Sequence, residues 1–164
     1  MANIGVKYYI PVAIALLLGI ASFCMMFLEG VKYSADLIIA QTSYSYTGAQ
    51  LAFGYAEESV TILSFNFMAF IAFLLPVIGG LIAVLFKNGL ITKIVSTACF
   101  VVGAVFLFSM VGFATIGMSD FQLAIVEQLN PSLGVGCIVG AVLSIIGGAI
   151  CLFKGSIAKA LGGD

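Results

Sequence analysis

Four long runs without a charged residue constrain this fold more than any other feature. They cover residues 9–28, 64–86, 94–117 and 133–153. Each is long enough to cross a hydrocarbon core about 30 Å thick, which takes about 20 apolar residues in a helix. An unpaired backbone group in lipid costs several kcal/mol, and strands of a membrane barrel would be about 10 residues long with alternating polarity. The sequence therefore predicts an all-α membrane protein, a four-transmembrane-helix bundle forming one integral membrane domain over residues 1–164.

The composition agrees with a membrane protein. Charged residues make up 8% of the chain, whereas soluble domains carry about 25%. The first apolar run exceeds the 7–15 residues of a secretory signal core, and no small-x-small cleavage site follows it. The bulky Phe23 before Cys24 disfavours a lipoprotein signal. We expect the first run to be an uncleaved helix.

Lysines predict the orientation of the bundle. The six lysines lie outside the predicted spans, five of them on one side of the membrane and only Lys32 on the other. The rule that positive charge stays inside then predicts a multi-pass plasma-membrane protein whose N- and C-termini are cytoplasmic. Residues 87–93 form the inner loop, and residues 29–63 and 118–132 form two outer loops. The five lysines are Lys7, Lys87, Lys93, Lys154 and Lys159.

The first outer loop is the longest segment outside the predicted spans. Residues 37–46 and 50–55 are rich in β-branched and aromatic residues and flank the turn-like Thr47-Gly48. We expect a small β-prone extracytoplasmic unit here, a hairpin that packs on the helix ends or on a partner, because an isolated hairpin is marginally stable in water.

The second outer loop is shorter and contains a helical pattern. Residues 120–129 predict a short helix that ends at Asn130-Pro131. Its apolar residues are expected to face the membrane helices. They are Phe121, Leu123, Ala124 and Leu129.

The sequence offers little catalytic chemistry. It contains no histidine, which removes the usual haem ligand and the commonest metal ligand. The predicted spans hold no ionisable residue away from their ends, which disfavours a proton-coupled transporter. Four cysteines lie within spans without a C-x-x-C pair, so packing roles are favoured, although a bridge between Cys24 and Cys137 stays open. We expect no cofactor, no bound metal, no nucleic acid and no enzymatic activity.

Small residues suggest how the helices pack. Gly136, Gly140, Ser144 and Gly148 recur every four residues along the fourth run, a pattern that lets a neighbouring helix approach closely. The neighbour could belong to the same chain or to a second copy. In the second run, Pro76 beside Gly79 and Gly80 predicts a kink.

Two resemblances follow from these features. Four spans, both ends inside, a longer β-prone first outer loop and a tight inner turn resemble the topology of the claudin superfamily of junction and myelin proteins. The chain lacks that superfamily's loop signature of tryptophans and two cysteines. Residues 46–54 followed by the Ser64-Phe-Asn-Phe-Met68 entry into the second span resemble small uncharacterised bacterial four-span membrane proteins, a likeness that implies no activity.

Two classes of function remain. The first is a non-enzymatic structural or interaction protein whose outer loop docks a membrane-protein partner or a second copy, as in a homo-oligomer. Aromatic side chains dominate binding energetics, so the candidate anchors are Tyr44, Tyr46, Phe53 and Tyr55. The alternative is a small channel or transporter for an uncharged solute, gated near Pro76.

Overall fold

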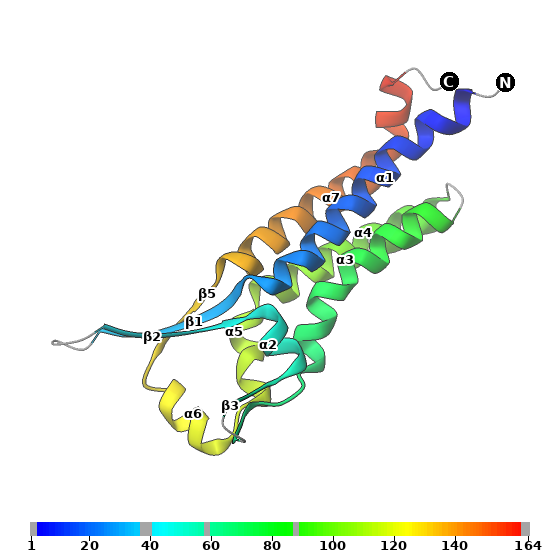
Figure 1. The fold of residues 1–164 in the computed structure, drawn as a ribbon. Coiled ribbons are helices and arrows are strands. Elements are labelled where there is room, and N and C mark those ends of the chain that lie inside the picture. Colours follow the sequence, from blue (N-terminus) through cyan, green and yellow to red (C-terminus); the bar gives the residue numbers. More distant parts are fainter. Residues whose placement is uncertain (1–2, 37–40, 58–59, 87–88, 162–164) are drawn as a thin grey trace.

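Four long helices dominate the computed structural model, which describes residues 3–36, 41–57, 60–86 and 89–161 (Figure 1). Their apolar stretches, Tyr9–Phe27, Phe67–Leu85, Leu90–Phe108 and Val135–Ala160, are long and apolar enough to cross a membrane. This confirms the prediction of a mostly helical chain with four helices long and apolar enough to span a membrane. The long helices are α1 (Asn3–Cys24), α3 (Phe67–Leu85), α4 (Leu90–Phe108) and α7 (Val135–Ala160).

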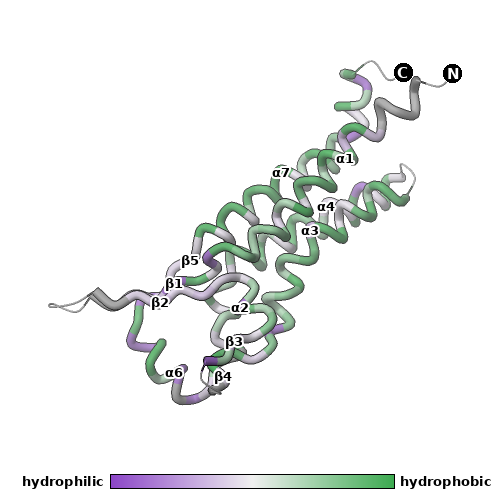
Figure 2. The backbone as a smooth tube through the Cα atoms, in the orientation of Figure 1, coloured by the Kyte–Doolittle hydropathy of each residue, from purple (hydrophilic) through white to green (hydrophobic). Residues whose placement is uncertain are grey.

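Shorter elements gather at one end of the bundle. The 3₁₀ turns are η1 (Met25–Phe27) and η2 (Thr115–Gly117), and the short helices are α2 (Gly48–Phe53), α5 (Met110–Ala114) and α6 (Asp120–Val126). The strands are β1 (Glu29–Asp36), β2 (Gln41–Thr47), β3 (Tyr55–Glu57), β4 (Val60–Leu63) and β5 (Asn130–Leu133). We call the elements from β1 to β4, together with α6 and β5, the sheet unit. Figure 2 shows the hydrophilic positions concentrated in this unit and at the opposite helix ends.

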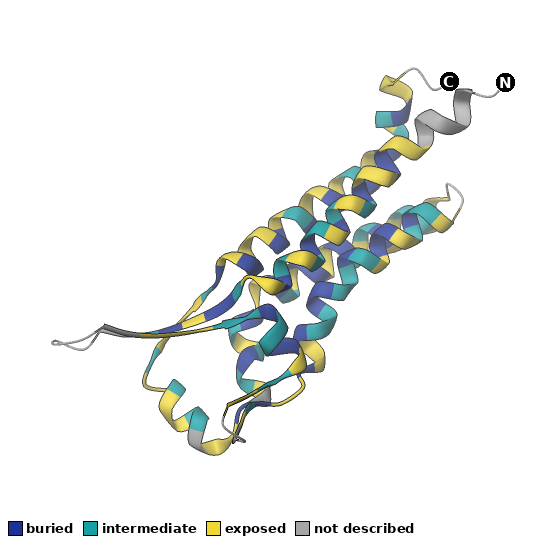
Figure 3. Cartoon of the chain, in the orientation of Figure 1, coloured by how far each residue is buried: buried dark blue, intermediate teal, exposed yellow. Residues whose placement is uncertain are grey.

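The helices pack in a closed ring of neighbours, in which α1 contacts α3 and α7, and α4 contacts α3 and α7. The buried positions follow the inner face of each helix while the outer faces are exposed (Figure 3). One core cluster at mid-bundle contains Val12, Ala15, Ala83, Phe100 and Cys151. Small side chains at these contacts allow close packing, which holds helices together in lipid, where no hydrophobic force acts between them.

The helices differ in their limits from the predicted spans; α1, for example, begins at Asn3 where the first span was predicted to begin at residue 9. The run at 94–117 divides into α4 and α5 around Ser109, which lies outside regular helix geometry at φ −89° and ψ 7°. The fourth run was expected to end at residue 153, whereas α7 continues to Ala160. Lys154 therefore lies within the helix, with a side chain 1% exposed.

The predicted hairpin of residues 37–46 with 50–55 is wrong, and a different antiparallel pair forms one segment earlier, between β1 and β2. β1 pairs antiparallel with β2, and β5 pairs with the other edge of β1, giving the order β2-β1-β5. The turn expected at Thr47-Gly48 is wrong, because Gly48 begins α2. Thr47 caps this helix: its side chain accepts from the Gln50 N–H and the Gln50 side chain accepts from the Thr47 N–H. That reciprocal cap favours a helix over a strand. Residues 37–40 of the predicted first strand lie outside the described residues.

A second, two-stranded sheet follows α2. Gly54 ends α2 with a φ of +90°, and a Cβ there would lie 2.7 Å from the Leu63 carbonyl oxygen, so only glycine fits. β3 then pairs antiparallel with β4. The chain thereby reverses and leads into α3.

The second outer loop contains the predicted helix, α6, and an unexpected strand. Leu123 and Leu129 pack against the core as expected, whereas Ala124 is exposed. The side chain of Phe121 lies outside the described residues. Asn130 and Pro131 do more than end the helix, because they belong to β5 and pair with Ser34 and Tyr33. Proline is tolerated there because an edge strand leaves some N–H groups unused.

Asn66 ties the start of α3 to α5. Its side-chain oxygen accepts hydrogen bonds from the Met68 and Ala69 N–H groups at the start of α3. Its amide donates to the Phe113 carbonyl oxygen at 2.6 Å. One side chain thus caps α3 and joins it to α5, as a polar tie between helices does in a membrane protein.

Candidate functional site: a tyrosine-lined cavity

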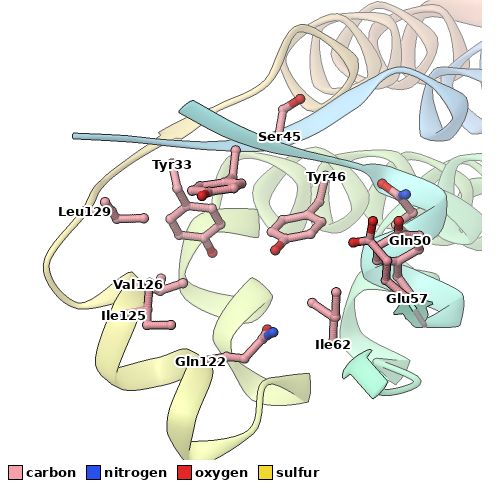
Figure 4. Close-up of a pocket in the computed structure, with 12 residues that line it drawn as sticks. Tyr33, Ser45, Tyr46, Gln50, Glu57, Ile62, Gln122, Ile125, Val126 and Leu129 are labelled. Atoms are coloured by element: carbon pink, nitrogen blue, oxygen red, sulfur yellow. The ribbon is translucent and has the colours of Figure 1, made fainter. Parts of the chain in front are cut away.

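A cavity of about 370 Å³ lies between the three-stranded sheet and α6 (Figure 4). Its walls come from β1, β2, α2, β3 and β4 on one side and from α6 on the other, so segments far apart in sequence form it together. Its size falls in the range of small-molecule sites, about 300–1,000 Å³. The lining residues are Tyr33, Tyr44, Ser45, Tyr46, Gln50, Tyr55, Glu57, Ile62, Gln122, Ile125, Val126 and Leu129.

Strand register places three tyrosines over the cavity. Tyr33 of β1 lies directly opposite Tyr44 of β2, and Val31 lies opposite Tyr46. Because side chains alternate between sheet faces, these four residues share one face. The rings of Tyr33 and Tyr46 meet edge to face with centroids 6.2 Å apart. Tyr33 and Tyr46 extend from the sheet towards α6 in Figure 4.

Two buried polar atoms in the cavity wall have no hydrogen-bond partner among the described residues. They are the hydroxyl of Tyr33 and the side-chain oxygen of Gln122. Tyr33 is 1% exposed. An unsatisfied buried polar atom costs about 1–3 kcal/mol, and most such atoms in proteins are paired. In Figure 4 both side chains point into the space between the sheet and α6, so a bound molecule could satisfy both.

The described lining of the cavity contains one acidic residue and no basic residue. Among its described lining residues, Glu57 alone carries a formal charge at neutral pH. Burial, and secondarily Tyr46, raises the pKa of Tyr33 to about 12, so its hydroxyl remains protonated. Burial is also the main cause that raises the pKa of Tyr46, and the nearby Tyr44, Tyr55 and Glu57 raise it further. Deprotonation of either tyrosine hydroxyl is disfavoured because it would create a negative charge in a partly buried site beside other titratable groups.

The structure separates the four predicted anchors. Tyr44, Tyr46 and Tyr55 line the cavity. Phe53 lies elsewhere, with its ring 5.6 Å from that of Phe70. Phe70 also meets Phe65, at 6.2 Å, near the start of α3. Exposed aromatic rings at a helix end are typical of the membrane–water boundary.

Sequence reasoning missed Tyr33 and Gln122. The alternation of Val31, Lys32 and Tyr33 is a strand pattern, but strands were predicted in the first outer loop only from residue 37 onwards. No local signal identifies Gln122, because only the fold brings α6 to the sheet. Tyr33, Val126 and Leu129 also line a second cavity of about 300 Å³ that reaches Glu127 and Pro131.

The small-residue stripe of α7 faces helices of the same chain. A Cβ on Gly136 would lie 2.5 Å from the Met25 carbonyl oxygen. Ser22 of α1 donates to the Gly140 carbonyl oxygen at 2.9 Å and lies 3.0 Å from the Ser144 hydroxyl. Gly148 faces Phe100 of α4, at 3.1 Å from a built Cβ. The stripe therefore packs within the bundle.

The segment around Pro76 is closely packed. α3 is helical on both sides of Pro76, which is buried. A Cβ on Gly19 of α1 would lie 2.6 Å from the Pro76 carbonyl oxygen, and one on Gly103 of α4 would lie 2.9 Å from the Pro76 ring. Gly79 meets Ser96, whose hydroxyl donates to the Gly79 carbonyl oxygen at 2.8 Å. Gly80 meets Leu16.

The cysteines form no bridge. All four are free, and Cys24 is exposed while Cys137 is buried. Among the residues that the structure describes, no three histidine, cysteine, aspartate or glutamate side chains form a group that could hold a metal ion.

No protein family, curated protein or solved structure matches the chain.

Proposed function

We propose that this chain is a non-enzymatic membrane-anchored interaction protein that binds through its sheet unit, with the tyrosine-lined cavity as the binding site. The observation that carries the proposal is the cavity itself. Its lining includes Tyr44, Tyr46 and Tyr55 together with two buried polar atoms that have no hydrogen-bond partner among the described residues. Concave sites with apolar walls and a few convergent polar groups are typical of binding sites.

The packing of the bundle gives less support to the alternative of a channel or transporter. A gate near Pro76 needs room between the helices, whereas Gly19 and Gly103 bring two backbones against this residue. The sheet unit, in contrast, holds a cavity large enough for a ligand or for side chains of a partner.

Photo-crosslinking tests the proposed function. The photoreactive residue p-benzoylphenylalanine would replace Tyr44 at the cavity or Phe53 outside it, one at a time, in native membranes. The two positions are matched, because their side chains are 55% and 57% exposed. We expect Tyr44 to yield an adduct that Phe53 does not yield. An adduct with a second copy of the chain would identify self-association. Identical adducts at both positions, or none at Tyr44, would contradict the proposal.

We also propose that the sheet unit faces outside the plasma membrane and that both termini are cytoplasmic. Figure 1 places the start of α1, the ends of α3 and α7 and the start of α4 at one end, opposite the sheet unit. Lys93 and Lys159 belong to α4 and α7 near that end, and Lys32 belongs to β1. Lysine-rich ends stay cytoplasmic.

Labelling of single cysteines tests this orientation. Lys32→Cys and Lys159→Cys would be made in a variant without native cysteines; both positions are exposed. In intact cells, a membrane-impermeant maleimide is expected to label position 32 and to label position 159 only after permeabilisation. The reverse pattern would refute the orientation.

A further inference from the structure

We propose that the tyrosine-lined cavity binds an organic ammonium ion that carries N–H groups and an apolar body. This inference rests on the proposed function and names the chemistry of the ligand. It follows from three properties of the cavity lining: two buried polar atoms without a partner among the described residues, one acidic residue and several apolar side chains.

The two unpaired oxygen atoms favour a ligand that donates hydrogen bonds. The side-chain oxygen of Gln122 can only accept a hydrogen bond, and the hydroxyl of Tyr33 can accept one as well as donate one. Both are buried without a partner among the described residues. A primary or secondary ammonium group offers at least two N–H donors and can satisfy both atoms. An ionised carboxylate or a phosphodiester offers no donor for Gln122.

The charge and the rings favour a cation. Glu57 supplies negative charge, and the described lining contains no lysine or arginine to oppose a cationic ligand. Tyr33, Tyr44, Tyr46 and Tyr55 supply aromatic rings, whose negative faces attract cations, most strongly in a desolvated site. An anionic ligand would meet repulsion from Glu57 and gain nothing from these rings.

The remaining wall favours an apolar body. Ile62, Ile125, Val126 and Leu129 line the same cavity. A ligand with a ring or a short alkyl chain would cover them while its ammonium group reaches Tyr33 and Gln122. The volume of about 370 Å³ accommodates a molecule of this size.

Binding of 2-phenylethylammonium tests the inference. The full chain would be reconstituted into vesicles of phosphatidylcholine, a lipid without N–H donors, and titrated while tyrosine emission is followed. This emission is a suitable signal because the chain has no tryptophan and six tyrosines, four of which line the cavity. We expect saturable binding. 2-Phenylethanol lacks the charge, and the N-trimethylated probe lacks N–H groups; each is expected to bind about tenfold more weakly or worse.

Matched variants locate the binding. Gln122→Leu and Tyr33→Phe are each expected to weaken binding about tenfold or more, since each removes a hydrogen bond to a charged group. Glu57→Gln should weaken it severalfold. The controls Gln128→Leu and Glu127→Gln change residues outside this cavity and should leave binding unchanged. Without ligand, Tyr33→Phe should melt no lower than the natural chain because it removes an unsatisfied hydroxyl, so weaker binding there would not reflect misfolding.

Competition by added lipid distinguishes the two sources of the ammonium group. Other outcomes distinguish the ammonium inference from the proposed function. If added phosphatidylethanolamine competes with the probe, the occupant is a lipid headgroup; if it does not, the occupant is a free amine. Equal binding of probe and 2-phenylethanol, or equal binding by the natural chain and Gln122→Leu, would overturn the ammonium inference. A specific adduct at Tyr44 would still leave the proposed function standing in that case.

Discussion

Substituting Gly19 by valine is expected to disrupt the packing of the bundle while its helices persist. A Cβ at Gly19 would lie 2.6 Å from the Pro76 carbonyl oxygen and 3.3 Å from the Val77 Cα. Backbone atoms cannot move aside as a flexible side chain can, so α1 and α3 must separate. We expect a loss of at least about 3 kcal/mol, at or beyond the upper end of overpacking in cores. Thermal unfolding of purified protein in detergent micelles measures this loss, and far-ultraviolet circular dichroism checks that helix content is retained.

Gly140→Ala is the matched control. Gly140 also lies at a contact between helices, but its nearest neighbours, Leu107 and Ser22, lie 3.4–3.5 Å from a built Cβ, an ordinary contact. The melting temperature should change little, since alanine also favours helix over glycine by about 1 kcal/mol. Equal destabilisation by the two substitutions would contradict the close approach of α1 to Pro76. Such a result would reopen the alternative of a gate in this region.

The four membrane helices could be predicted because apolar length is a local property. Any run of about 20 uncharged residues must satisfy its own backbone in lipid. The ends were harder to place. Ser109 interrupts the third helix although its neighbours are apolar, and α7 continues past Lys154, which is buried. Neither outcome follows from the hydropathy of one segment alone.

The sheet unit could be predicted less well because its contacts are non-local. Strand propensity was correctly recognised around Tyr44 and Tyr46, but Gln50 and Thr47 complete a helix cap that outweighs the strand pattern of residues 50–55. β5 has only four residues, including Pro131, and its partner β1 lies about a hundred positions earlier. No periodicity reveals such a strand.

The candidate site combines residues that local composition identifies with residues that only the folded chain brings together. Aromatic content alone selected Tyr44, Tyr46 and Tyr55 and also Phe53, which packs near the start of α3 instead. Only strand register adds Tyr33, and only the position of α6 adds Gln122. The two atoms on which the ammonium inference depends are therefore those that the sequence could not supply, because their importance comes from lacking a partner in the folded chain.

Phe100 is expected to show strong energetic coupling to Gly147. Phe100 is fully buried between α3 and α7. A Cβ on Gly147 would lie 2.6 Å from its ring, and one on Gly79 would lie 3.0 Å from it. Phe100→Ala should destabilise the bundle by about 3–5 kcal/mol. Much of that cost should persist in lipid, because it comes from lost packing contacts and a residual void.

A double-mutant cycle tests this contact. Gly147→Ala alone should cost about 1–3 kcal/mol, since its methyl group collides with the ring. In the Phe100→Ala background the same methyl group enters the void, so it should cost nothing or stabilise the bundle. The two changes should therefore couple by more than about 1 kcal/mol. Gly112→Ala is the control, because a Cβ there meets no described atom within 4 Å, and its effect should add to that of Phe100→Ala. If the effects of Gly147→Ala and Phe100→Ala were also simply additive, the Phe100 ring would not lie against Gly147. The close packing of α4 on α7 would then have another cause.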